Sequence, residues 1–170
     1  QRTVFDARQR LTSTSGTRAS FDFELLDEYA SSRLSGALAL PAILLILALF
    51  STLWVPVIAA ATWVVLVIAA NTVVVLLCRQ FKRSDRQKFN AARWTARFVA
   101  AETAYGVSWA LLSLFSLVTA DTQNLSVAMF AMVLVGVAAN AVSTRTLPPA
   151  TLMSTLPATL TVSINLVVSG

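Results

Sequence analysis

The sequence predicts an all-α fold, a polytopic membrane helix bundle with five transmembrane helices in these residues. Its composition is 56% hydrophobic and only 12% charged, whereas a soluble domain carries about 25% charged residues. The charges gather in two blocks, and the uncharged stretches are each about 20 residues long, which is the length of a membrane span. Because the chain opens without a Met and closes on an apolar run, we expect it to be a piece of a longer protein in which a sixth span follows.

Residues 1–33 are predicted to form a cytoplasmic arm followed by a juxtamembrane amphipathic helix. Residues 1–20 are rich in Arg, Ser and Thr and have no hydrophobic period, so we expect a flexible arm there. Residues 21–33 have an apolar residue at every fourth position, which is typical of a helix with one apolar face. Such a helix can lie along the membrane surface or lead directly into the first span. The apolar positions are Phe21, Leu25 and Tyr29.

Residues 34–170 are predicted to form the transmembrane bundle. Pro41 lies in the first span and Pro157 in the fifth, where each removes one backbone hydrogen bond and tends to kink the helix. We interpret both kinks as static. No internal repeat is visible, which gives no support to an inverted-repeat transporter. The spans are predicted at about 34–53, 57–78, 98–120, 127–143 and 150–168.

The distribution of Lys and Arg predicts the orientation of the bundle. All 13 basic residues lie in residues 1–33, in residues 79–97 or at Arg145. With alternating spans these three segments face the same side, whereas the loops 54–56 and 121–126 contain no Lys or Arg. The positive-inside rule therefore places the N-terminus in the cytoplasm. We expect a multi-pass protein of the bacterial inner (plasma) membrane.

The segment 79–97 is the most charged part of the chain, and aromatic residues are interleaved with its charges. Such a mixture can bind nucleic acid. We interpret it instead as a loop whose basic residues contact anionic lipid headgroups and whose aromatic residues enter the interface. The expected partner is thus the lipid bilayer, with no nucleic acid. The basic residues of this segment are Arg79, Lys82, Arg83, Arg86, Lys88, Arg93 and Arg97.

Glu102 is the only ionisable residue predicted inside a span. An acid within the membrane is costly and is by default a functional candidate. On a helix it shares one face with Tyr105, Gly106 and Trp109, at spacings of i+3, i+4 and i+7. A carboxylate beside aromatic rings and a glycine predicts a polar pocket with a sensing role.

The alternative for Glu102 is a purely electrostatic role. Glu102 follows Arg97 by five residues, which is about 7 Å along a helix at 1.5 Å per residue. Its carboxylate can then reach back to the cytoplasmic interface and pair with Arg97 or Arg93. Both interpretations stay open on the sequence alone.

Three Asn residues fall within predicted spans, namely Asn71, Asn140 and Asn165. Asn in hydrocarbon usually bonds to a neighbouring helix and stabilises the packing. The alternative is a polar cluster at the centre of the bundle. These three residues join Glu102 and its aromatic neighbours as candidate intramembrane polar sites.

Several classes of chemistry are not supported by these residues. The single cysteine, Cys78, excludes an internal disulfide, and the absence of His removes the commonest metal ligand and general base. No P-loop, nucleophile elbow, metal-ligand spacing or pair of inward-facing acids is present. We therefore expect no metal site, no cofactor and no catalytic residue in this part of the protein.

About residues 20–115 resemble the N-terminal membrane region of alphaproteobacterial sensor histidine kinases related to the PleC/DivJ type. The resemblance implies a transmembrane input region joined to cytoplasmic PAS, dimerisation and ATPase modules outside these residues, and it implies a homodimer. The shared pattern is a Tyr-Ala-x-x-Arg-Leu before the first span, a Trp at the outer turn, a Cys-Arg-x-Phe after the second span and a Glu with Tyr-Gly and Trp in the third. Here these residues are Tyr29, Ala30, Arg33 and Leu34; Trp54; Cys78, Arg79 and Phe81; and Glu102, Tyr105, Gly106 and Trp109.

The first functional hypothesis is thus a membrane-embedded input domain of a signal-transducing protein, specifically a two-component sensor histidine kinase. Since the outer loops are very short, the stimulus would come from within the bilayer, from its surface or from a partner membrane protein. A small transporter, or part of one, is the second hypothesis, supported by the Pro-bearing spans and the Asn residues. The membrane sensor region of a cyclic-dinucleotide enzyme is the third.

Overall fold

The computed structural model describes residues 14–53, 55–84, 90–114 and 123–169. These residues form six helices and no strand, which confirms the all-α prediction for the described part of the chain. The helices are α2 (Thr14–Ser35), α3 (Ala39–Ser51), α4 (Val57–Lys82), α5 (Ala91–Leu114), α6 (Gln123–Thr144) and α7 (Pro148–Ser169).

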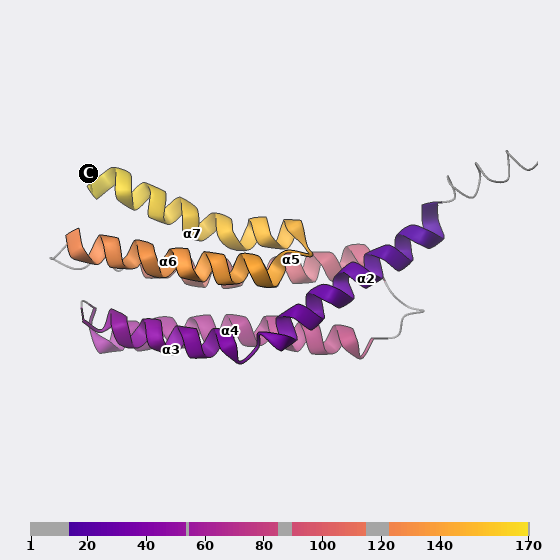
Figure 1. Cartoon of the computed structure of the whole chain (residues 1–170), viewed down its shortest axis with the longest axis horizontal. Coiled ribbons are helices and arrows are strands. Elements are labelled where there is room, and N and C mark those ends of the chain that lie inside the picture. Colours follow the sequence, from indigo (N-terminus) through magenta and orange to yellow (C-terminus); the bar gives the residue numbers. More distant parts are fainter. Residues whose placement is uncertain (1–13, 54, 85–89, 115–122, 170) are drawn as a thin grey trace, which may run out of the picture.

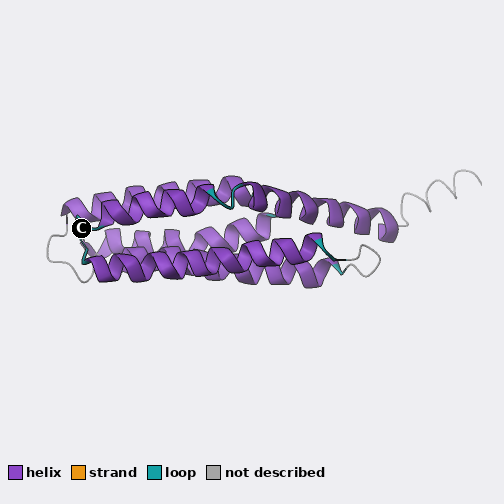
Figure 2. Cartoon of the chain, turned by 90° about the horizontal axis from the view of Figure 1, so that it is seen from below, coloured by secondary structure: helices purple, strands orange, loops and turns teal. Residues whose placement is uncertain are grey.

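Helices α3 to α7 lie side by side along the long axis of an elongated bundle (Figures 1 and 2). At one end, which we call the hairpin end, α3 turns back into α4. At the other end, which we call the α2 end, α4 stops, α5 starts and α6 turns into α7. Helix α2 crosses this second end and packs against α4, α5 and α6 (Figure 1).

The first predicted span differs from the structure. A break at residues 36–38 separates α2 from α3, and the axes of the two helices differ by 49°. With 13 residues, α3 is about 20 Å long at 1.5 Å per residue, which is less than the ~30 Å hydrocarbon core of a bilayer. Pro41 lies in the first turn of α3, where a missing N–H leaves no intrahelical bond unmade. The chain therefore bends before Pro41 rather than at it.

The N-terminal helix is also longer than predicted. It begins at Thr14 rather than at residue 21, so part of the predicted flexible arm is helical, and residues 1–13 lie outside the described residues. The helices α4, α6 and α7 cover the second, fourth and fifth predicted spans, and Pro157 lies inside α7 as expected. Helix α5 begins at Ala91, before the predicted start of the third span.

Among the described residues one helix, α4, is long and apolar enough to cross a membrane. The bent pair formed by α2 and α3 is a second candidate if the two helices make one span. Helix α5 carries Arg93, Arg97 and Glu102, and α7 is rich in Ser and Thr, which lowers their hydropathy. The structure thus gives a weak indication of a membrane protein, and five spans remain a prediction.

Two glycines set how closely the helices pack. A Cβ atom on Gly106 would lie 2.1 Å from the backbone oxygen of Ser154, so the backbones of α5 and α7 are in direct contact there. A Cβ atom on Gly136 of α6 would lie 2.5 Å from the ring of Trp109. Since neither position has room for a side chain, both glycines are needed for this packing.

An aromatic cluster fixes α2 to the bundle. Phe23 of α2 packs on Phe81 of α4 with ring centroids 5.4 Å apart, and Tyr29 packs on Phe98 of α5 at 4.9 Å. Trp94 of α5 packs on Phe81 of α4 with ring centroids 5.3 Å apart, and its ring centroid lies 5.9 Å from that of Phe98. These rings lie at the α2 end and place the next turn of α2 against α5.

Candidate functional site: a buried ion pair between α2 and α5

The buried face of α2 ends in an arginine. Leu26, Tyr29, Ala30 and Arg33 are each at most 2% exposed and follow each other at spacings of i, i+3, i+4 and i+7. Of the predicted apolar face, Tyr29 lies on this buried face, whereas Phe21 is 61% exposed. The aromatic cluster turns α2 so that Arg33 points into the bundle.

Arg33 forms an ion pair with Glu102 of α5. The guanidinium Nη2 bonds to one carboxylate oxygen, and Nε donates to the other at 2.7 Å. Tyr29 donates its hydroxyl proton to the second oxygen at 2.5 Å. The side chains of Arg33 and Glu102 are 1% and 0% exposed, so the pair is completely removed from the surface.

The pair extends into two further helices. Arg33 Nη2 also donates to the side-chain oxygen of Asn140 in α6 at 2.6 Å, and the Asn140 amide donates to the Ser154 hydroxyl of α7 at 2.6 Å. One continuous set of hydrogen bonds thus joins α2, α5, α6 and α7. We call Tyr29, Arg33, Glu102, Asn140 and Ser154 the buried polar network.

Because the network is buried, its free energy depends strongly on how well its charges are paired. Two charges in a low-dielectric interior are tolerated only when each pairs well and its remaining polar atoms are satisfied. Burial also raises the pKa of the Tyr29 hydroxyl, with the neighbouring Glu102 charge acting in the same direction. Tyr29 therefore stays protonated and remains a donor to the carboxylate.

Glu102 does not pair with the basic residues near it in sequence. Arg97 instead lies over the Trp94 ring, with its guanidinium carbon 5.2 Å from the ring centroid, and Arg93 is exposed. The predicted pairing with Arg97 or Arg93 is therefore wrong, because α2 supplies Arg33 from the opposite direction.

The predicted stripe on α5 is buried as expected. Tyr105 is 1% exposed and Trp109 is 4% exposed. The Arg33 guanidinium lies 5.3 Å from the centroid of the Tyr105 ring, which joins this ring to the ion pair. Trp109 packs edge-on to Trp63 of α4 with the centroids 5.5 Å apart.

The three Asn residues have different positions. Asn140 is part of the buried polar network, whereas Asn71 is buried on α4 and no hydrogen bond joins it to that network among the described residues. The side chain of Asn165 lies outside the described residues. The structure thus brings together Glu102, Tyr105 and Asn140 of the predicted polar candidates.

The basic residues of the predicted lipid-facing segment lie at the α2 end. Arg79, Arg83 and Arg93 are exposed, and the exposed Lys82 donates to Asp27 of α2 at 2.6 Å. Arg86 and Lys88 lie outside the described residues.

Sequence reasoning missed Arg33, Tyr29 and Ser154 as site residues. In the sequence Arg33 is one of the basic residues that set orientation and a member of the Tyr-Ala-x-x-Arg-Leu pattern, and neither property predicts that it is buried. Its position four residues after Tyr29 and three after Ala30 was the available signal, because that spacing places it on one face with them. Ser154 had no signal, since its role depends on the backbone contact at Gly106.

No family model, curated protein or solved structure matches this chain. The site is therefore interpreted from its own geometry. Among the described residues no group of His, Cys, Asp and Glu side chains is arranged to hold a metal ion. What the arrangement provides is an ion pair, shielded from water, that holds α2 against three other helices.

Proposed function

We propose that α3 to α7 lie in a lipid bilayer. The supporting observation is the surface of the bundle, where large apolar side chains are exposed on all five helices, from Leu38 to Val167. Among the described residues α2 adds only Phe21 to this set. Residues 34–78 contain no charged residue, and after Glu102 only Asp121 and Arg145 are charged. A continuous apolar surface of this kind suits contact with lipid rather than water.

The hydroxyl groups of α7 are compatible with this environment. Thr155 donates to the backbone oxygen of Thr151 at 2.8 Å, Thr159 to that of Thr155 at 3.1 Å, and Thr161 to that of Pro157 at 3.0 Å. Hydroxyls that are bonded within their own helix do not need water. The low hydropathy of α7 therefore overestimates the free energy needed to insert this helix into a bilayer.

The proposed orientation follows from the charges. The exposed basic residues that the structure describes lie at the α2 end, namely Arg79, Lys82, Arg83, Arg93 and Arg145. By the positive-inside rule this end faces the cytoplasm, where its basic residues contact anionic headgroups. The protein is then a multi-pass protein of the bacterial inner membrane.

Within this setting the chain functions as the input domain of a signal-transducing protein, and its resemblance to sensor histidine kinases favours that class. The observation that carries the proposal is the ion pair between Arg33 and Glu102. A signal that changes helix packing must shift an equilibrium between two arrangements. Docking of α2 through one buried pair supplies such an element, because the pair is stable only when both partners are in place.

The test uses the intact protein in native membrane vesicles. We expect Glu102→Gln and Arg33→Gln each to change the output activity severalfold, measured as autophosphorylation with labelled ATP or, for a cyclic-dinucleotide enzyme, as nucleotide turnover. Lys82→Gln is the matched control, since it removes the exposed ion pair with Asp27 and should leave the output unchanged. Unchanged output in both buried-pair variants would remove the network from the signalling mechanism.

The coding sequence beyond Gly170 tests the kinase assignment separately. A further span followed by a phosphoacceptor His and an ATP-binding module would support it. Further membrane helices without a soluble module would favour the transporter instead.

A further inference from the structure

Three buried hydrogen-bond donors at or beside the ion pair have no partner among the described residues. One is Nη1 of Arg33 itself. The other two are the Tyr105 hydroxyl and the indole N–H of Trp109, and neither of these residues is more than 4% exposed. Buried polar groups are nearly always paired, so unpaired donors of this kind indicate a place where another molecule binds. The neighbouring Trp63 shows the ordinary case, because its indole N–H donates to the backbone oxygen of Ser108 at 3.0 Å.

Tyr105 and Trp109 both line one small cavity between α5, α6 and α7. Its volume is about 10 Å³, which is enough for a single oxygen-sized atom. The other polar side chains that line it, Asn140 and Ser154, already bond to each other within the buried polar network. Tyr105 and Trp109 are therefore the residues lining the cavity whose side-chain donors are still unpaired.

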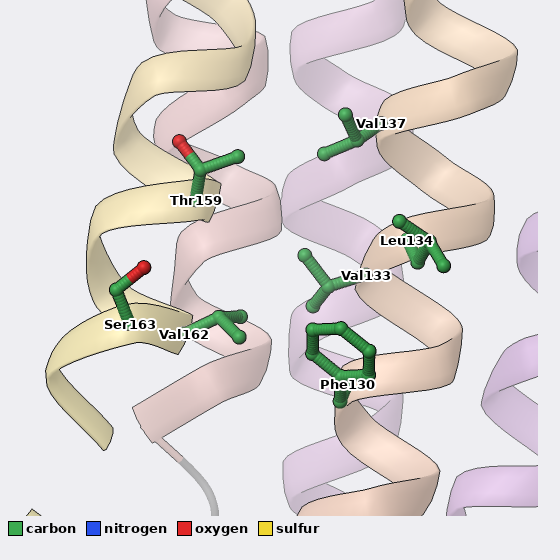
Figure 3. Close-up of a pocket in the computed structure, with 7 residues that line it drawn as sticks. All are labelled: Phe130, Val133, Leu134, Val137, Thr159, Val162 and Ser163. Carbon is green, nitrogen blue, oxygen red and sulfur yellow. The ribbon is translucent and has the colours of Figure 1, made fainter. Parts of the chain in front are cut away.

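A larger cavity adjoins the small one towards the hairpin end. It has a volume of about 130 Å³ and lies between α6 and α7, and Val137 lines both cavities. Figure 3 shows Phe130, Val133 and Val137 on α6 across from Val162 on α7. The remaining residues that line it are Leu134, Thr159 and Ser163.

The larger cavity is apolar and opens on the surface of the bundle. Phe130 is 43% exposed and Leu134 is 56% exposed, so a molecule can enter between these side chains. The Thr159 hydroxyl donates to backbone oxygens of its own helix and is not available to a ligand. This cavity therefore suits a hydrocarbon body.

We propose that the cavities between α6 and α7 bind a membrane-dissolved amphiphile with one hydrogen-bond-accepting oxygen and a short apolar body. The oxygen accepts from Tyr105 and Trp109, and the body occupies the larger cavity. A neutral oxygen fits better than a carboxylate, because the charge of Arg33 is already balanced by Glu102. The inference rests on the proposed bilayer placement and gives the chemical class of the stimulus for the proposed input domain.

The experiment uses the full chain in lipid nanodiscs with 15N in its indole rings. Its four Trp residues give four indole signals, and each is assigned from the spectrum of a single Trp→Phe variant. The probes are 1-octanol and, as the matched compound without oxygen, n-octane. We expect 1-octanol to shift the Trp109 signal saturably, n-octane to leave it in place, and the Trp63 signal to stay unchanged with both.

Variants locate the two parts of the site. Tyr105→Phe removes one donor and should weaken 1-octanol binding about fivefold, which is the effect of one hydrogen bond. Val162→Phe fills the larger cavity and should abolish saturable binding. Leu160→Phe is the matched control on α7, because Leu160 is 54% exposed and does not line the cavity.

The outcomes separate this inference from the proposed function. If the chain inserts into nanodiscs and the Trp109 signal does not move, or moves equally with n-octane, the amphiphile site is overturned and the bilayer placement stands. Water alone then occupies the small cavity. A chain that does not insert would overturn the bilayer placement itself.

Discussion

The two ends of the bundle are held together in different ways. At the α2 end, four helices are joined by the buried polar network and by packed aromatic rings, and the backbones of α5 and α7 are in contact at Gly106. At the hairpin end, α3 packs mainly on α4, and an open apolar groove of about 350 Å³ lies between them. Directional bonds specify one arrangement at the α2 end, whereas apolar contact at the hairpin end permits several.

The difference suggests a division of roles. A network of directional hydrogen bonds has a discrete geometry, so a helix held by it is either docked or released. A loosely packed apolar end can adjust its side chains to lipid or to a membrane-dissolved ligand without changing between two discrete arrangements.

Removing one partner of the buried ion pair should cause the largest loss of stability. Glu102→Leu leaves the Arg33 guanidinium buried without its counter-charge, and we expect a loss of about 3–5 kcal/mol in the free energy of unfolding. The measurement is denaturant or thermal unfolding in detergent micelles, followed by near-UV circular dichroism. The double variant Arg33→Met with Glu102→Leu should recover at least half of the loss, because replacing both charges by apolar groups is often neutral. Equal losses in the single and double variants would contradict an ion-pair origin.

Closing the glycine contact should have the next largest effect. In Gly106→Ala the new Cβ meets the Ser154 backbone at 2.1 Å, so α5 and α7 must move apart, at a cost of about 1–3 kcal/mol. Gly36→Ala is the matched control, because the nearest atom to its Cβ lies 3.7 Å away, which is ordinary contact. The same unfolding assay checks both variants, and similar midpoints would show that the backbone contact is not needed.

Removing the Tyr29 hydroxyl should have a smaller effect. Tyr29→Phe keeps the ring on Phe98 and deletes only the hydrogen bond to Glu102. Since Arg33 Nε still donates to the same carboxylate oxygen, we expect a loss of about 1.5 kcal/mol. A larger loss in the unfolding assay would mean that Tyr29 rather than Arg33 holds the carboxylate in place.

Adding bulk at the hairpin end should have the smallest effect. Ala61 lines the groove between α3 and α4 and is exposed, so Ala61→Leu has room for its side chain. We expect a change within about 0.5 kcal/mol, as at other exposed positions. A destabilisation comparable to that of Gly106→Ala would show that the two ends are packed equally tightly.

Much of the helical architecture could be predicted from the sequence because long uncharged runs and clustered charges are local properties. The boundaries of α4, α6 and α7 lie near the predicted ends of their spans for this reason. The break between α2 and α3 could not be predicted, since the apolar residues continue across it. The side of α2 that faces the bundle could not be predicted either, because it depends on the packing of Phe23 and Tyr29 against aromatic rings of α4 and α5.

The amino-acid sequence was sufficient to predict that these residues form apolar helices, that their basic residues gather at one end, and that Glu102 is the acid within a predicted span. These properties follow from composition and spacing along the chain. The basic residue that pairs with Glu102 is set by the way the helices pack in the tertiary structure. Arg33 lies 69 positions away and reaches the carboxylate because α2 folds back over α5, and the partner of a buried charge is fixed by helix packing rather than by distance along the sequence.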